Sequence, residues 1–256
     1  MKKKSLLYAS FGALIFLFSC QKDISGPASQ EVMNTPLPGQ TVYCRIESIW
    51  ENPNQFDQRF ILILYDQYEN PTAITTPLPG TGHPYRVFKY DSWHRLRELI
   101  GDYGNGHFEF WHFYGFDLSG RIGVDTVYTF GQLLDKPVGY IEKRISNIEY
   151  DSQNRIVKVS NTNNFGASWV DTYAYDGTGN LVGGTYDHRI NLSRTNDIWM
   201  FLGRDYSLNN RFNADAYNTN GYPTLINLSG AFDTWLPGEV DLTHSQISYG
   251  CRPSYY

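Results

Sequence analysis

The chain has 256 residues, with 21 Lys and Arg against 26 Asp and Glu, and a formal net charge of −5. An acidic chain of this kind lacks the concentrated basic surface that phosphate binding needs, so nucleic acid is not the expected partner. No uncharged apolar run approaches the roughly 20 residues that span a bilayer, which excludes a permanent transmembrane helix.

The first residues have the order of a secretory signal. Three lysines at positions 2–4 precede an uncharged, mostly apolar run over residues 6–18. Ser19 then stands before Cys20, whose thiol could accept diacylglycerol before cleavage. The sequence therefore predicts a lipoprotein signal peptide over residues 1–19 and a lipidated Cys20. An ordinary cleaved signal with an incidental cysteine is the alternative.

Lipidation would anchor the protein firmly. The new N-terminal amine is acylated as well, with palmitate or a similar chain, and anchoring by more than one chain is stable. Removal of residues 1–19 takes three lysines and no acids, which leaves 18 basic against 26 acidic residues, or −8. Residues 20–40 are rich in Pro, Ser, Gly and polar residues, so we expect a flexible tether. Residues 41–256 suit a single β-rich domain.

A repeated pair, an aromatic residue followed by aspartate, is the strongest signal in this domain. Its copies lie at intervals of 25, 26, 34, 25 and 42 residues, which indicates a repeated supersecondary unit. The aspartates are Asp66, Asp91, Asp117, Asp151 and Asp176, and Asn218 stands in a variant sixth copy. Residues on either side alternate in polarity as β-strands do.

Each copy predicts a tight turn. The aspartate can accept hydrogen bonds from backbone N–H groups two residues on. The third position after it is occupied by Glu69, His94, Gly120, Asn154, Gly179 and Gly221. Four of these six are Gly or Asn, which enter the left-handed region most readily and so favour a type I turn closed by a bulge residue.

We therefore predict an all-β fold of about six hairpins. A 25-residue period leaves two strands of roughly nine residues each, or about 30 Å. A long antiparallel meander of such strands is expected to curl into a wide barrel or a wrapped sheet, because a flat sheet of that size leaves open edges.

Two cysteines remain after lipidation. Cys44 and Cys251 lie near the two ends of the domain, in a compartment where disulfides persist. A bond between them would bring the first and last strands together. Two unpaired, buried thiols are the alternative. A zinc site is not expected, because neither cysteine belongs to a CxxC or HxxxH spacing.

These motifs resemble two known groups. The pattern of aromatic, Asp, two variable residues, Gly or Asn, then Arg or Asn, as in residues 150–156 and 175–181, resembles the YD repeat of Rhs-type proteins. Together with the lipobox, segments 44–49, 217–224 and 247–251 resemble Bacteroidetes lipoproteins that carry a domain of unknown function with a porin-like fold. The resemblance implies a barrel-like sheet and a periplasmic or surface lipoprotein, but no activity. Copies one and six depart from the pattern.

Catalytic and metal motifs do not stand out. The six histidines are scattered singly, and no GxSxG, P-loop or dinucleotide fingerprint occurs, so we expect no catalytic residues, no metal and no cofactor. Forty-one residues are aromatic, and exposed rings can stack on sugars or partner proteins. The candidate binding rings are Trp50, Trp93, Trp169, Trp199 and Trp235. The alternative is that these rings fill the pleated faces of the strands and pair with side chains of neighbouring strands.

The expected protein is a non-enzymatic, lipid-anchored component of the outer membrane with a binding or structural role. Charges recur in strand-like runs such as residues 86–90 and 141–145, which disfavours a lipid-facing barrel and favours a water-soluble sheet. Its partners are the membrane, through the lipid, and an unidentified protein or glycan. The alternative is a glycan-binding lipoprotein, with glycan hydrolysis as a weaker variant.

Overall fold

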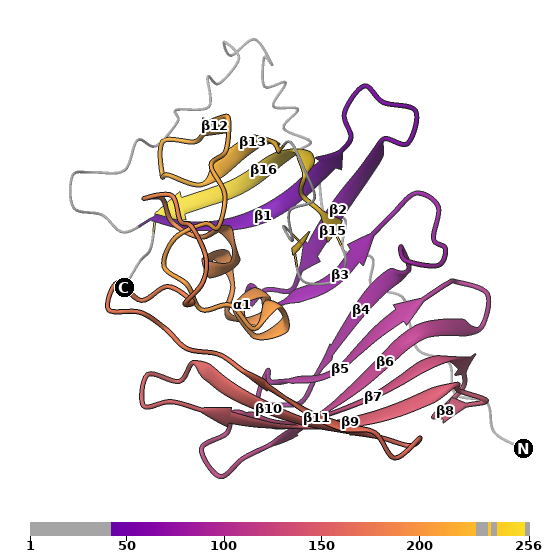
Figure 1. Ribbon diagram of the computed structural model, residues 1–256. Coiled ribbons are helices and arrows are strands. Elements are labelled where there is room, and N and C mark those ends of the chain that lie inside the picture. The colour runs from indigo at the N-terminus through magenta and orange to yellow at the C-terminus, as the bar shows by residue number, and fades with distance from the viewer. Residues whose placement is uncertain (1–41, 229–234, 237–239, 254–256) are drawn as a thin grey trace, which may run out of the picture. The chain divides into compact units, whose positions relative to one another are not determined.

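The computed structural model of the chain describes residues 42–228, 235–236 and 240–253 (Figure 1). The chain divides into two units, Met1–Pro38 and Gly39–Tyr256, and all described residues belong to the second. The predicted signal peptide, Cys20 and the tether over residues 20–40 lie outside the described residues. Within the described part, no helix has the length and apolarity that crossing a membrane requires.

The described residues form an almost entirely antiparallel β structure. One sheet of 14 strands has the order β11-β10-β9-β7-β6-β5-β4-β3-β2-β1-β16-β13-β12, with β8 paired to β7, and β14 and β15 form a separate pair. The strands are β1 Val42–Glu51, β2 Arg59–Tyr65, β3 Pro71–Thr75, β4 Tyr85–Tyr90, β5 Leu96–Asp102, β6 His107–Phe116, β7 Ile122–Leu133, β8 Pro137–Val138, β9 Glu142–Tyr150, β10 Ile156–Asn163, β11 Ser168–Thr172, β12 Ala216–Tyr217, β13 Pro223–Asn227, β14 Trp235–Leu236, β15 Val240–Asp241 and β16 His244–Pro253.

The predicted all-β meander is confirmed, and the sheet is wrapped and not closed. β11 and β12 lie at its two ends and do not pair with each other. The first strand does pair with the last, with Cys44 opposite Cys251. This pairing leaves the sheet open because β16 enters between β1 and the β12–β13 hairpin, so the contact lies inside the sheet.

Five of the six predicted turns connect strands of the sheet, and the turn of the fifth copy, at Asp176, lies between Tyr175 and Leu181, which form only an isolated bridge. All six turns have the predicted bulge residue in the left-handed region. The residues with positive φ are Glu69 at 67°, His94 at 60°, Gly120 at 80°, Asn154 at 61°, Gly179 at 83° and Gly221 at 86°. A register shift accompanies the turns of β2–β3, β4–β5, β6–β7, β9–β10 and β12–β13. Local turn chemistry therefore fixes where these hairpins reverse.

Strand lengths and the helices differ from expectation. The strands vary from 2 residues in β8, β12, β14 and β15 to 12 in β7, against the roughly nine predicted. Two short helices also occur, η1 at Leu192–Thr195 and α1 at Asp197–Gly203. Both begin at an asparagine, Asn191 and Asn196, whose side chain accepts a backbone hydrogen bond of the first turn. They occupy the long interval before the sixth repeat.

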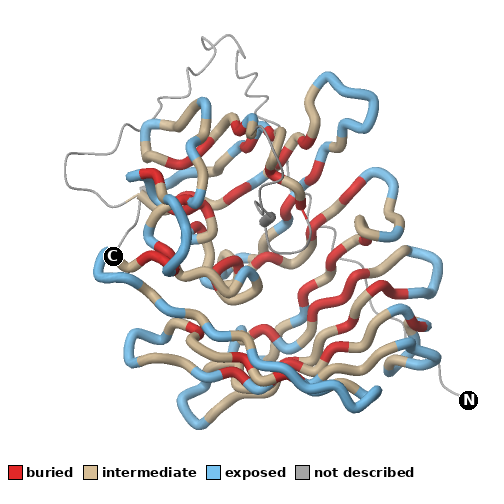
Figure 2. The backbone as a smooth tube through the Cα atoms, viewed as in Figure 1, coloured by how far each residue is buried: buried red, intermediate tan, exposed pale blue. Residues whose placement is uncertain are grey.

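The sheet curls around these helices (Figures 1 and 2). Trp199 and Leu192 are buried against isoleucines of β1, β2 and β3, while Phe201 also packs against Ile156 and its neighbours on β9 and β10. One short helical segment therefore contacts both halves of the sheet. The buried side chains of this segment cover part of the concave face of the sheet.

Candidate functional site

Five of the six repeat turns lie at one edge of the sheet, and the turn at Asp176 lies outside the sheet strands. Because every neighbouring pair of strands is antiparallel, β2, β4, β6, β9 and β12 run in the same direction and end at the same edge. The residues that follow them therefore form a row along that edge. Three consecutive turns in this row carry arginine four residues after the aspartate.

Asp151 shows how each turn is held. Its Oδ1 accepts the backbone N–H groups of Gln153 at 2.8 Å and Arg155 at 2.9 Å, and its Oδ2 accepts Nε of Arg155 at 2.8 Å. Asp91 and Asp117 make the same set of bonds. The carboxylate therefore fixes both the turn backbone and the arginine side chain.

These bonds shift the carboxyl groups toward ionisation. At Asp151 burial acts to raise the pKa, but the backbone and side-chain hydrogen bonds from Arg155 and the charge of its guanidinium outweigh burial, so the pKa lies below its usual value. The pKa values of Asp66, Asp91, Asp117 and Asp176 are lowered too. All five are carboxylates at neutral pH.

Each of the three arginines stacks on the aromatic residue of the next repeat. The guanidinium carbon lies 3.9 Å from the ring centroid of Phe116 for Arg95, and 4.6 Å from that of Tyr150 for Arg121. Arg155 lies 4.1 Å from the centroid of Tyr175. We call Arg95, Arg121 and Arg155 the arginine ladder. A guanidinium held by a carboxylate and a ring has a fixed plane.

Tyrosine hydroxyls join neighbouring hairpins. Tyr150 donates to the carbonyl of Ile122 at 2.8 Å, and Tyr90 donates to the carbonyl of Pro71 at 2.7 Å. Burial raises the pKa of Tyr150 to about 12, so this phenol remains a donor at neutral pH. The turns are thereby held relative to one another as well as internally.

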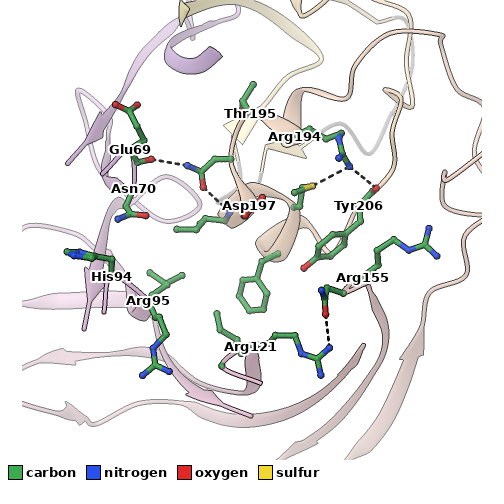
Figure 3. A pocket seen from close by; sticks show the side chains of 18 of the residues that line it. Glu69, Asn70, His94, Arg95, Arg121, Arg155, Arg194, Thr195, Asp197 and Tyr206 are labelled. Carbon is green, nitrogen blue, oxygen red and sulfur yellow. Dashed lines mark hydrogen bonds between the residues drawn. The ribbon is translucent and has the colours of Figure 1, made fainter. Parts of the chain in front are cut away.

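A cleft of about 1290 Å³ lies between the ladder and the helical segment (Figure 3). One wall consists of the turns, with the ladder and the bulge residues. The other contains Arg194, Thr195 and Asn196 of the helical segment. Asn196 donates through Nδ2 to the carbonyl of Glu69 at 3.0 Å, which joins the two walls at one end.

Cations predominate among the charged groups that line the cleft. They are five arginines, Arg95, Arg121, Arg155, Arg194 and Arg252, and two acids, Glu69 and Asp197. Arg252 pairs with Glu69. Arg194 donates to the Tyr206 carbonyl at 3.5 Å and contacts the Met200 sulfur at 3.8 Å, and no described carboxylate lies within ion-pair distance of it.

A second cavity of about 430 Å³ adjoins α1 on the concave face. His112 lies in its wall with Nδ1 2.9 Å from Oδ1 of the buried Asp125. Arg144 and Arg204 also line it. Among the described residues, no group of three or more His, Cys, Asp and Glu is placed to hold a metal ion. We take the larger cleft as the candidate site, because it has about three times the volume and is lined by five arginines.

The predicted tryptophans do not gather at this cleft. Trp199 has no exposed surface and belongs to the hydrophobic core, which corrects its assignment as a binding ring. The reason is its place on the inner side of α1. Trp93 is 73% exposed on a turn and Trp169 is 38% exposed on the edge strand β11, while Trp50 is half-buried in β1. The side chain of Trp235 lies outside the described residues.

The two cysteines are bonded to each other. Cys44 and Cys251 form a disulfide with a sequence separation of 207 residues. The predicted turn residues Asp66, Asp91, Asp117, Asp151 and Asp176 all accept backbone hydrogen bonds within their turns. Gly120, Asn154 and Gly179 line the cleft together with the bulge residues Glu69 and His94.

The arginines that line the cleft were not singled out from the sequence. The ladder arginines stand at a constant offset from the repeat aspartate, and that offset was a signal available in the sequence. Arg194 had no such signal, because it belongs to the segment between repeats. No protein-family model matches the chain, and no curated protein sequence matches it.

Proposed function

We propose that this protein is a lipid-anchored component of the bacterial cell envelope, attached to the outer membrane through Cys20, whose cleft binds a ligand outside the cytoplasm. The signal-like N-terminus and the sequence resemblance support the anchor. The cleft supports binding, because ordered guanidinium groups line a cavity large enough for a ligand of several rings.

The observation that best supports a binding function is the fixed position of the arginine ladder. Each arginine is fixed by an aspartate in its own turn and by a ring of the next turn. A binding site gains affinity when its donors are ordered before the ligand arrives, since less side-chain entropy is then lost. Three such donors in one wall are more than the turns themselves require.

The anchor is tested by mass spectrometry of the N-terminal peptide from the native bacterium. We expect an acylated peptide that begins at Cys20. The variant Cys20→Ala should leave the membrane fraction without detergent. An unmodified Cys20 in the purified membrane protein would overturn the anchoring proposal.

The binding site is tested by a photo-crosslinking residue introduced into the full-length chain in growing cells. Gln153 is exposed and lines the cleft, so crosslinking from position 153 should yield a discrete adduct. Gln58 is equally exposed but lies in the loop between β1 and β2, and it serves as the matched control. Absence of an adduct at position 153, or equal adducts at both positions, would contradict the proposal.

A further inference from the structure

The ladder has a defined repeat distance. Its arginines belong to the consecutive hairpins β4–β5, β6–β7 and β9–β10, so each step along the cleft crosses two strands. Neighbouring strands lie about 4.8 Å apart, which places successive guanidinium groups about 9.5 Å apart. The three guanidinium groups therefore follow one another along the row of turns at about two strand spacings.

This spacing discriminates between polymeric ligands. An extended peptide presents side chains on one face every second residue, or about every 6.8 Å, so its acidic groups do not match the ladder. Nucleic acid is disfavoured by the acidic balance of the protein. A disaccharide unit of an extended linear glycan has a length close to two strand spacings. Such a glycan would place one sugar of each disaccharide at each arginine.

Hydrogen-bonding capacity remains at the ladder after its internal bonds are made. The bonds to Asp91 use Nε and Nη2 of Arg95, and the bonds to Asp151 use Nε and Nη2 of Arg155. The Nη1 groups of these two arginines lie outside these pairs, whereas Nη1 of Arg121 donates to Oδ1 of Asn154 at 3.0 Å. The side chains of the three arginines are 32%, 33% and 21% exposed, so solvent and ligand can reach them.

The opposite wall adds positive charge. Arg194 lies on the other side of the cleft from Arg95 and Arg121 in Figure 3, with its guanidinium group directed at the Met200 sulfur and the Tyr206 carbonyl. No described carboxylate forms an ion pair with it. Guanidinium groups form strong, directional hydrogen bonds with carboxylates and sulfates. An anionic group between the walls would therefore accept hydrogen bonds from charged guanidinium groups of both walls. A neutral sugar would not gain the charge interaction with these arginines.

We infer that the ligand of the cleft is a linear glycan that carries an anionic group, a carboxylate or a sulfate, on every second sugar. This inference rests on the proposed binding function and specifies its ligand class. The glycan lies along the row of turns, with its anions at the arginine ladder and Arg194 on the opposite side.

The test is titration calorimetry of the full-length chain in detergent with hyaluronan oligosaccharides, which carry one carboxylate per disaccharide. The same oligosaccharides with their carboxyl groups reduced to alcohols are the matched neutral probe, and poly-glutamate is the acidic peptide probe. We expect binding of the acidic glycan that weakens with salt. Both other probes should bind at least tenfold more weakly, because the neutral oligosaccharide has no charged groups and the carboxylates of poly-glutamate do not match the ladder spacing, and each lost charged contact is worth about tenfold in affinity.

Three variants locate the binding. Arg194→Gln should weaken the acidic glycan about tenfold with unchanged thermal stability, because Arg194 makes no described ion pair. The double variant Arg121→Gln, Arg155→Gln should weaken it further, with its melting temperature measured alongside. Arg189→Gln is the matched control, since Arg189 also stacks on a ring, Tyr217 at 5.2 Å, but lies outside the cleft lining. Its affinity should equal that of the natural chain.

Each other outcome overturns the inference in a distinct way. Equal binding of the neutral oligosaccharide would remove the anionic requirement, and tighter binding of poly-glutamate would replace the glycan with a peptide. No binding of any probe, or equal losses in Arg194→Gln and Arg189→Gln, would reject this ligand class. In those cases a crosslinked adduct at position 153 would still support the proposed binding function.

Discussion

Aspartate at the start of five of the repeat turns accepts backbone hydrogen bonds that hold the turn. Asn218 occupies the same position in the sixth repeat and accepts the backbone N–H groups of Asn220 and Tyr222, both at 3.0 Å. Asn163 makes the equivalent bonds at the opposite edge of the sheet. An amide therefore replaces the carboxylate in the backbone role, but it does not form the ion pair with arginine.

This comparison predicts a graded response at Asp151. Asp151→Asn should lower the free energy of unfolding by about 1 kcal/mol, since only the bonds to the Arg155 side chain weaken. Asp151→Ala should lower it by about 2–3 kcal/mol, since the turn backbone loses its acceptor too. Urea denaturation measures both values. Asp135→Asn, at an exposed position of the β7–β8 loop, is the control, and equal losses for the two Asp151 variants would contradict the assignment.

At the scale of the elements, the row of turns links stability to pH. The five repeat aspartates have lowered pKa values, so their contribution is present above the unfolded-state pKa of about 4 and is lost as pH falls through the folded values. We expect the urea midpoint to fall steeply below pH 4. Asp151→Asn should show a shallower fall, and an unchanged slope would refute the linkage.

Helix α1 is too short to be stable by itself, and its packing holds it in place. Trp199 anchors it with a fully buried ring that meets Phe88 edge-on at 5.9 Å between centroids. Because Arg194 and Asn196 precede this helix, the anchor also positions the second wall of the cleft.

Trp199→Ala should therefore lower the free energy of unfolding by about 3–5 kcal/mol and loosen the cleft. The measurement is chemical denaturation, with hydrogen exchange of residues 192–204 as a local readout. Trp93→Ala removes a ring that is 73% exposed, and a change of about 0.5 kcal/mol is expected for it. Similar effects of the two substitutions would show that α1 is not anchored as described.

At the scale of the whole molecule, the disulfide joins strands from the two ends of the domain. Cys44 and Cys251 are directly opposite in the β1–β16 ladder, which continues for two residue pairs on one side, to Val42, and as far as Glu51 on the other. The bond therefore restricts the unfolded chain more than it shapes the folded sheet. For a loop of 207 residues the chain-entropy treatment gives a stabilisation of up to about 5 kcal/mol.

The double variant Cys44→Ala, Cys251→Ala should unfold at a lower urea concentration but keep the β-sheet circular dichroism of the natural chain. The reduced natural chain should behave like the double variant. Loss of the sheet signal in both, without denaturant, would show that the bond is needed for folding.

The sequence by itself determined the reversals of the chain. A turn of this type depends on about five consecutive residues, so the Asp, the bulge residue and the alternation around them were enough to place six reversals of the chain, five of them between strands of the sheet, and the all-β class. The tertiary structure alone decided the insertion of β16 beside β1, the open edges, and the burial of Trp199. It also formed the cleft, whose walls meet where Asn196 bonds to Glu69, 127 residues away. Such contacts form because distant apolar faces are buried together, and no local pattern specifies which distant segment will cover a given face.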